Sequence, residues 1–348
     1  MSGMMLRVVR WFGWNINRLA LFLYFKFCWV RSRLIGPTSW VKSRWEGDRD
    51  LAAATRVALF VHYDPKGIVH EFVLYYLERL NALGFTPIFV TNGPRPTAAA
   101  LDLLRPLCGR ILWRRNRGYD FGAYKDALLE VPDLDALEML IIANDSVYGP
   151  LQPLEEIIAR ADPEQADVWG ITDSYEHHYH LQTYFLLVHR RALASSGFRA
   201  FWKRLVYTQS KTVVIHKYEI GFSKHLLAAR LRLAAIHPYR ELAFEIADDL
   251  RRRTQRDPKW WRHVGHADHL KWLYGIITSG CPLNPSHFFW EPLTVKHRCP
   301  FLKRELLTRN PCQVPMVFFW EEAIAQVSDY DTGMITRHLQ YLLRNRSI

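Results

Sequence analysis

The stretch LIIANDSVYGPL at residues 140–151 joins a buried strand to a polar ending. The apolar run at 140–143 is typical of a strand that is covered on both faces of a sheet. It stops at the Asn-Asp-Ser triplet at 144–146, and the Gly-Pro pair at 149–150 then turns the chain. A carboxylate at the mouth of a buried strand has no part in an apolar core. The stretch therefore predicts a ligand site at the carboxyl end of a parallel sheet.

Apolar, β-rich runs and helical patterns alternate on both sides of this stretch. The expected strands are 56–64, 85–92, 110–116, 136–144 and 167–174, and the expected helices between them are 67–84, 96–108, 121–131 and 151–162. Alternation at this spacing is typical of βαβ units. It predicts an α/β fold with a mainly parallel sheet.

Each expected strand ends in a small polar or acidic residue, namely Asp64, Asn92, Asn116, Asn144 with Asp145, and Asp173. Any one of them is explained by a turn or a helix cap, which is the usual reason for Asn and Asp at such positions. In a parallel sheet, however, the carboxyl ends of the strands share one edge, where ligands bind. Their convergence favours a site.

Asp145, beside other oxygen ligands, suits a hard cation such as Mg²⁺ or Mn²⁺, which binds carboxylates and completes its shell with phosphate oxygens. The sequence has no P-loop and no GxGxxG. The remaining common arrangement is a sugar-nucleotide site, in which a diphosphate rests on a metal at a strand end.

The segment NRGYDFGAYKDALLE at 116–130 agrees with this interpretation. Asn116-x-Gly118 lies 28 residues before Asn144 (144 − 116), about the distance between an Asn-x-Gly loop and the DxD motif in family 2 glycosyltransferases of the GT-A fold. A glycine there lets the backbone approach a nucleotide. The alternative is a plain strand–turn–helix joint, with Gly118 left-handed and Asp120 as the helix N-cap; Asp120 is compatible with both roles.

Together these motifs resemble the rhamnan synthesis protein F family, bacterial glycosyltransferases of cell-wall and O-antigen polysaccharides. The resemblance is carried by RNRGYDFGAYKDAL, LIIANDSVYGPL, DVWGITDS and HLQTYF, and it extends from RVALFVHYD near residue 56 through FRAFW (198–202) and KYEIGFSKHL (217–226) to NPSHFFWEPL (284–293) and PFLKRELL (300–307). It implies a GT-A-like core and inverting transfer from a nucleoside-diphosphate sugar, by the family name dTDP-L-rhamnose. The implied acceptor is a growing lipid-linked cell-surface polysaccharide.

The positions at the strand ends and the resemblance together assign roles to residues. Asp145 is the expected ligand of a divalent cation, although this motif has one carboxylate where DxD has two, so that Lys or Arg side chains are an alternative counter-charge for the diphosphate. The expected donor-binding residues are Asp64, Asn92, Asn116, Gly118, Asp120, Asn144, Ser146, His180 and Gln182. The expected general base is Glu219, in the first turn of a helix at 217–230, with Asp173 as its rival. Acidic residues are also common in the first turn of a helix for a purely structural reason, because their charge interacts favourably with the helix dipole.

Most of the formal charge of +12 lies in the first 45 residues, which hold eight Lys and Arg and no acid; the other 303 residues carry +4 (12 − 8). This arm includes RLALFLYFKFCWV at 18–30, whose apolar stretch 19–25 is shorter than the ~20 residues that span a bilayer. A basic, aromatic helix on a nearly balanced body predicts binding to an anionic membrane surface and not to nucleic acid. The alternative is a helix docked on the protein's own body.

The expected organisation is a membrane-associating arm at 1–45, a GT-A-like core at 55–235, and a mostly helical acceptor or accessory region at 236–348. Five cysteines without a CxxC pair fit a reducing compartment. The sequence thus predicts a cytoplasmic glycosyltransferase, peripheral on the inner face of the cell membrane. The alternatives are a non-catalytic glycan- or lipid-binding scaffold of a polysaccharide assembly complex and a nucleic-acid-binding protein that uses the positive charge.

Overall fold

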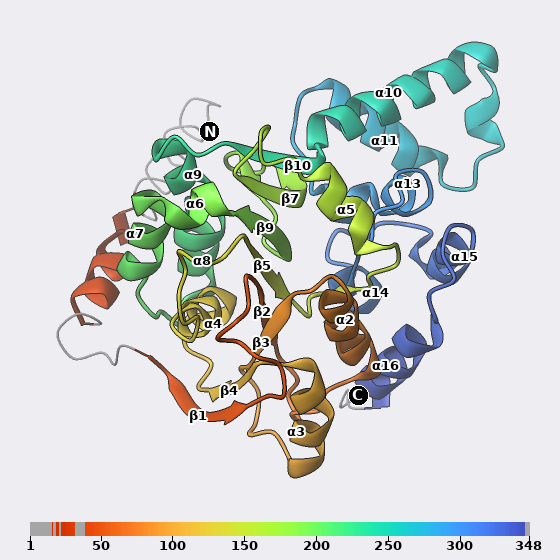
Figure 1. The fold of residues 1–348 in the computed structure, drawn as a ribbon. Coiled ribbons are helices and arrows are strands. Elements are labelled where there is room, and N and C mark those ends of the chain that lie inside the picture. Colours follow the sequence, from red (N-terminus) through yellow and green to blue (C-terminus); the bar gives the residue numbers. More distant parts are fainter. Residues whose placement is uncertain (1–15, 17–18, 21, 32–38, 345–348) are drawn as a thin grey trace.

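The computed structural model describes residues 16, 19–20, 22–31 and 39–344. In this part of the chain, nine strands form one sheet in the order β1-β4-β3-β2-β5-β9-β7-β10, with β8 paired to β7 (Figure 1). The strands are β1 (Val41–Glu46), β2 (Arg56–His62), β3 (Thr86–Thr91), β4 (Arg110–Arg114), β5 (Met139–Asn144), β7 (Val168–Ser174), β8 (His180–Leu181), β9 (Phe185–His189) and β10 (Leu233–His237). All five strands expected from the sequence are confirmed.

The centre of the sheet is parallel. Strands β4, β3, β2 and β5 run in one direction, and β10 runs parallel to β7. β9 lies antiparallel between β5 and β7, and β1 adds an antiparallel edge beside β4. The prediction of an α/β fold with a mainly parallel sheet is confirmed.

Helices cover both faces of the sheet, because the central strands alternate their buried side chains. In β2, Ala58 and Phe60 pack into one core with α2 (Glu71–Ala82), α3 (Ala98–Leu104) and α5 (Leu154–Arg160). Val57, Leu59 and Val61 pack into the other core with α4 (Tyr119–Leu128), α7 (Ser196–Arg204) and α9 (Ile220–Ala228). Each such fully buried side chain contributes roughly 1.5–3 kcal/mol, so a strand with two apolar faces is strongly held at the centre.

The region after β10 is mostly helical, as expected. It contains α10 (Tyr239–Arg256), α11 (Ala267–Thr278), α12 (Pro285–Phe288), α13 (Trp290–Val295), α14 (Arg304–Thr308), α15 (Trp320–Ala325) and α16 (Gly333–Arg344), with short 3₁₀ turns at Trp260–Arg262 and Val317–Phe319. Figure 1 shows α10 and α11 projecting from one end of the molecule, while α16 returns to lie beside α2. This region also supplies a short strand, β11 (Leu302–Lys303), which pairs with β6 (Val147–Tyr148) just after the Asn-Asp-Ser triplet.

The remaining helical elements lie in the core half of the chain. They are a 3₁₀ turn at Arg105–Leu107, α6 (Arg190–Ala194), α8 (Lys211–Val214) and a π-helical turn at Ile215–Glu219 that runs on into α9.

Much of the predicted arm lies outside the described residues. In its described part, residues 22–31 are helical, and Phe25 and Trp29 pack against the core that contains α4. Phe22, Leu23 and Phe27 are exposed on the same helix. The last five residues of the segment, 41–45, belong to the sheet as part of β1 (Val41–Glu46). Among the described helices, none is both long and apolar enough to cross a bilayer.

Candidate functional site

The carboxyl ends of β2 and β5 meet at the point where the strand order reverses. β3 and β4 follow β2 on one side, whereas β5 lies on its other side, so a crevice is expected between β2 and β5. Asp145 joins the two ends. Its backbone N–H donates to the Val61 carbonyl at 3.0 Å, and its Oδ2 accepts from the Tyr63 N–H at 3.2 Å.

The two motifs expected to form the site are in direct contact. Asn144 Nδ2 donates to Asp120 Oδ2 at 3.2 Å and to the Tyr124 hydroxyl at 3.0 Å. Asn144 Oδ1 accepts from the Ser146 N–H at 3.1 Å and from its hydroxyl at 2.5 Å. The Asn side chain thus fixes both the triplet and the first turn of α4.

Gly118 supplies the left-handed residue that starts α4. It has φ 84° and is the N-cap, and a Cβ there would lie 3.2 Å from the Gly122 Cα. Asp120 lies inside the first turn and not at the N-cap, and no side chain caps this helix. The alternative in which Asp120 is the N-cap is therefore wrong, and its carboxylate is left to face Asn144.

A buried arginine that the sequence analysis did not single out supports the loop before α4. Arg114 Nε donates to Asp126 Oδ2 at 2.6 Å, and neither side chain is exposed to solvent. Its Nη1 donates to Asn92 Oδ1 and its Nη2 to the Arg117 carbonyl, each at 2.6 Å. Asn92 therefore supports this loop indirectly, through Arg114, while Asn116 is exposed on the loop.

Two further cations reach the site from the C-terminal region. The pairing of β11 with β6 places Lys303 opposite Val147, and the Arg304 N–H donates to the Ser146 carbonyl at 3.0 Å. Arg304 Nη1 forms an ion pair of 2.8 Å with Asp145 Oδ2, and Lys303 Nζ lies 3.4 Å from Ser146 Oγ. The segment PFLKRELL contributed to the family resemblance, but no role was assigned to its Lys or Arg.

The charges at the site influence one another. Burial raises the pKa of Asp120 from 3.8 to about 6, and the negative charges of Asp145 and Glu219 add to the increase. Burial lowers the pKa of Lys303 from 10.5 to about 8, against the opposing effect of Glu219, Glu305 and Asp120. Both side chains keep some exposed surface, although protein atoms surround them. Glu219 therefore belongs to the same electrostatic cluster as Asp120 and Lys303.

Glu219 does not lie in the first turn of a helix. The helical run continues from Lys211 to Ala228, and Glu219 is the last residue of the π-helical turn between α8 and α9. The expected position is corrected accordingly, and a helix-dipole origin for this acid no longer applies. Single π turns inside α-helices are frequent at functional sites because they displace one residue from the helical register.

Asp64 and Asp173 each have a structural partner. Asp64 Oδ1 accepts from the backbone N–H groups of Lys66 and Ile68, at 2.8 and 3.0 Å, and these bonds together with His70 hold its pKa well below the usual range despite burial. Asp173 Oδ1 accepts from the Tyr239 N–H at 2.6 Å, at the start of α10, while burial raises its pKa.

His180 and Gln182 lie on the β7–β8 hairpin. His180 donates from Nδ1 to the His178 carbonyl at 2.9 Å, and Gln182 Nε2 donates to Asn284 Oδ1 at 3.0 Å. Burial raises the pKa of Glu176 in the turn between β7 and β8, and the negative charge of Glu219 adds to the increase. The Leu181 N–H donates to Ser223 Oγ of α9 at 3.0 Å, so the hairpin packs on the helix that follows Glu219, and Gln182 links it to the C-terminal region.

The donor groups do not fit the expected divalent cation. Oδ2 of the Asp145 carboxylate accepts from both Arg304 Nη1 and the Tyr63 N–H. Within residues 39–344 and the described part of the arm, no three His, Cys, Asp or Glu side chains are grouped so that they would hold a metal ion. Mg²⁺ and Mn²⁺ need several oxygen ligands, and here a guanidinium stands beside the single carboxylate.

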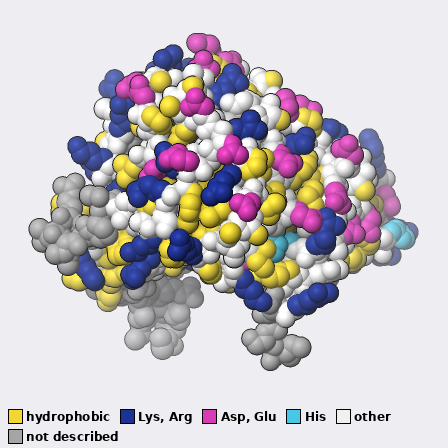
Figure 2. Space-filling model, turned by 60° about the horizontal axis from the view of Figure 1, so that its bottom comes forward, with side chains coloured by type: hydrophobic (Ala, Val, Ile, Leu, Met, Phe, Trp, Pro, Cys, Tyr) yellow, Lys and Arg dark blue, Asp and Glu magenta, His cyan; other side chains and the backbone are white. Residues whose placement is uncertain are grey.

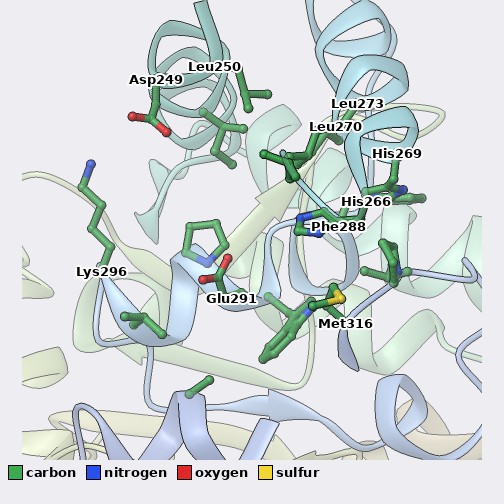
Figure 3. A pocket seen from close by; sticks show the side chains of 18 of the residues that line it. Asp249, Leu250, His266, His269, Leu270, Leu273, Phe288, Glu291, Lys296 and Met316 are labelled. Carbon is green, nitrogen blue, oxygen red and sulfur yellow. The ribbon is translucent and has the colours of Figure 1, made fainter. Parts of the chain in front are cut away.

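The C-terminal region contains a separate cavity of about 760 Å³, shown in Figure 3. Apolar side chains including Leu250, Leu270, Leu273 and Phe288 form much of its wall, with Met316 on one side. Charged side chains, among them Asp249, Glu291 and Lys296, also line it. The cavity lies among α10, α11 and α13 and does not include any residue of the site at β2 and β5.

Charged side chains of both signs lie on the face of the molecule that Figure 2 shows. In Figure 2, Lys and Arg side chains line the lower edge together with hydrophobic side chains, and Asp and Glu side chains lie above them. This mixture agrees with the small net charge of the chain beyond the arm.

Comparisons with known proteins agree with the sequence motifs. Residues 88–244 match the model of the family described as Rhamnan synthesis protein F, which confirms the expected resemblance over these residues. The chain is 28% identical over 185 residues to "Uncharacterized protein y4gN" of Sinorhizobium fredii, with 52% of this chain and 47% of that protein covered. It is 27% identical over 231 residues to "Virulence protein VirA" of Vibrio anguillarum, with 64% and 70% covered. The chain thus spans about half the length of the first relative.

Proposed function

We propose, starting from the match of residues 88–244 to the rhamnan synthesis protein F family, that the protein is a glycosyltransferase with a GT-A-like core. It moves a sugar from a nucleoside-diphosphate donor to a growing, lipid-linked cell-surface polysaccharide. The family description favours L-rhamnose, carried by dTDP, as the sugar. A role in polysaccharide synthesis is what the family match supports most directly.

The observation that carries the proposal is the contact between Asn144 and Asp120 at the reversal of strand order. It joins the Asn-x-Gly loop to the Asn-Asp-Ser triplet at the place where an α/β sheet binds its ligand. Gly118 allows the left-handed turn that starts α4 and the close packing of the loop against Gly122 and Tyr207, which fixes the loop beside the triplet.

Glu219 is the proposed general base. In an inverting transfer, the acceptor hydroxyl oxygen attacks the anomeric carbon while Glu219 takes the hydroxyl proton. The bond from that carbon to the diphosphate oxygen breaks, and the nucleoside diphosphate leaves with the electron pair. Glu219 suits this role because it ends the π-helical turn that leads into α9, the helix on which the β8 hairpin packs, and because its negative charge adds to the increase in the pKa of Asp120 on the donor side. Asp173 is less suited, since its carboxylate already binds the first N–H of α10.

Acceptor binding is assigned to the C-terminal region at 236–348. Its cavity offers aromatic and apolar walls with carboxylates nearby, a combination that accommodates both sugar faces and hydroxyl groups. The arm is proposed to hold the protein on the inner face of the membrane. In its described helix Phe22, Leu23 and Phe27 are exposed, and so is Lys26.

A panel of nucleotide sugars tests this function. Thermal shift should identify one nucleoside-diphosphate sugar, with dTDP-L-rhamnose first, that raises the melting temperature, and product analysis with a lipid-linked glycan should then show transfer. Stabilisation by no nucleotide sugar would reject a donor site. Donor binding without hydrolysis or transfer would instead support the non-catalytic scaffold.

A further inference from the structure

We infer that Lys303 and Arg304 bind the diphosphate of the donor directly, in the place that a divalent cation holds at a two-carboxylate motif. This inference rests on the proposed transfer from a nucleotide sugar and specifies how its site recognises the donor. It starts from the mismatch between the expected metal and the groups that are present: one carboxylate, already paired with a guanidinium.

The backbone fixes both cations at the mouth of the sheet. β11 pairs with β6 through Leu302 opposite Tyr148 and Lys303 opposite Val147. The Arg304 N–H extends this pairing to the Ser146 carbonyl at 3.0 Å. Side chains on a paired strand are held more firmly than those on a loop, and preorganised charges bind anions without a cost of rearrangement.

The Lys303 ammonium group is influenced by several acidic residues but forms no ion pair with any of them in the described part of the chain. Its Nζ lies 4.3 Å from the centre of the Tyr184 ring and 3.4 Å from Ser146 Oγ. Among the described residues it forms no ion pair within 4.0 Å, although the charges of Glu219, Glu305 and Asp120 act on it. A surrounded ammonium group in this state favours an anionic ligand, since desolvated charges require a partner.

Arg304 has binding capacity beyond its contact with Asp145. Both bonds to that residue, to the carbonyl and to Oδ2, come from Nη1. A guanidinium has five N–H donors in a planar fork, so the Nη2 and Nε groups are available for phosphate oxygens. Asp145 then has a different role from the expected one: it orients Arg304 and does not coordinate a metal.

Isothermal titration of the full chain with dTDP and UDP tests the inference, in EDTA and in MnCl₂. The expected result is the same dissociation constant in both. Lys303→Met should weaken binding of the diphosphates at least tenfold, while dTMP and UMP lose less, because the lysine contacts the second phosphate. Lys303→Arg should restore most of the affinity, and Lys203→Met, at an exposed lysine of α7, should change nothing.

Binding that requires Mn²⁺, or a Lys303→Met variant with unchanged affinity and an unchanged preference for diphosphate over monophosphate, would overturn the inference and leave the proposed function intact. Absence of binding to every nucleotide and nucleotide sugar, with or without metal, would reject both. If Lys303→Met does not fold, as judged by circular dichroism, the metal dependence of the unmodified chain decides the question.

Discussion

Asn144, the last residue of β5, donates a hydrogen bond of 3.2 Å to Asp120 in the first turn of α4. The contact connects two segments that are 24 residues apart in the chain (144 − 120). It holds a carboxyl group whose pKa is raised to about 6 by burial and by neighbouring negative charges. Perturbed acids of this kind are concentrated at functional sites.

Replacing this acid should stabilise the protein near neutral pH. The folded pKa of Asp120, about 6, lies above the ordinary value of 3.8, so between these values the folded state binds more protons than the unfolded state. The free energy of unfolding therefore falls as pH rises through this range. Asp120→Asn should remove that loss. It should raise the free energy of unfolding by up to about 2 kcal/mol at pH 7.5 and change it little at pH 4. Thermal melts of both proteins at the two pH values measure this, and an equal effect at pH 4 would contradict the prediction.

Glu219→Gln should lower kcat by about 10²–10⁴-fold, the usual contribution of a general base, with little change in donor affinity. The comparison variant is Asp173→Asn. The asparagine oxygen can still accept the first N–H of α10, and burial raises the pKa of Asp173, so loss of its charge should not lower the free energy of unfolding near neutral pH and should preserve the turnover of each folded molecule. Steady-state kinetics and melting temperatures of both variants separate the two roles. If the Glu219→Gln variant is active and the Asp173→Asn variant is inactive, the general base is Asp173 and not Glu219.

Asp145→Asn should abolish transfer while the fold is retained. Asparagine keeps an oxygen for the Tyr63 N–H, but the attraction that orients Arg304 is lost. Since this ion pair is partly exposed, the expected loss of stability is only about 1 kcal/mol. The measurement combines product formation with chemical denaturation. Full activity of Asp145→Asn, with and without a chelator, would show that the triplet takes no part in catalysis.

The pair of Arg114 and Asp126 predicts a much larger effect on stability. Asp126→Ala leaves a fully buried guanidinium without its counter-charge, which should cost about 3–5 kcal/mol of unfolding free energy. Asp135→Ala, which removes an exposed ion pair with Arg199, should leave the urea midpoint within error. Similar midpoints for the two variants would mean that Arg114 is not held by this charge.

The arm is expected to bind membranes through the exposed side of its helix. Changing Phe22, Leu23 and Phe27 together to Ser should release the protein from vesicles that contain phosphatidylserine, and high salt should do the same to the unmodified chain. Phe25 and Trp29 stay unchanged, because they pack on the body. Co-sedimentation is the measurement, and a triple variant that still pellets would assign membrane binding to another surface.

The sequence predicted the elements of the core well, because the strands around Phe60 and Ile141 are continuous apolar runs and the intervening helices have clear turn signals. It also predicted that the loop at Gly118 and the triplet at 144–146 belong to one site. It did not predict the ion pair of Arg304 with Asp145, because β11 has two residues and its pairing with β6 depends on packing of distant segments. The π-helical turn at Glu219 has no sequence periodicity of its own and was missed for the same kind of reason.

The pairing of β6 with β11 joins Tyr148 and Leu302, which are 154 positions apart in the chain (302 − 148). Closure of so long a loop is entropically unfavourable until the elements within it have packed, so this contact is expected to form late in folding. During synthesis the sheet, Asp120 and Asp145 emerge from the ribosome well before Lys303 and Arg304. We therefore expect the nascent chain to pass through a stage in which Asp120 and Asp145 are in place without Lys303 and Arg304. On the binding mode inferred above, it would gain the capacity to hold a diphosphate only when the last third of the chain packs against β6 in the middle third.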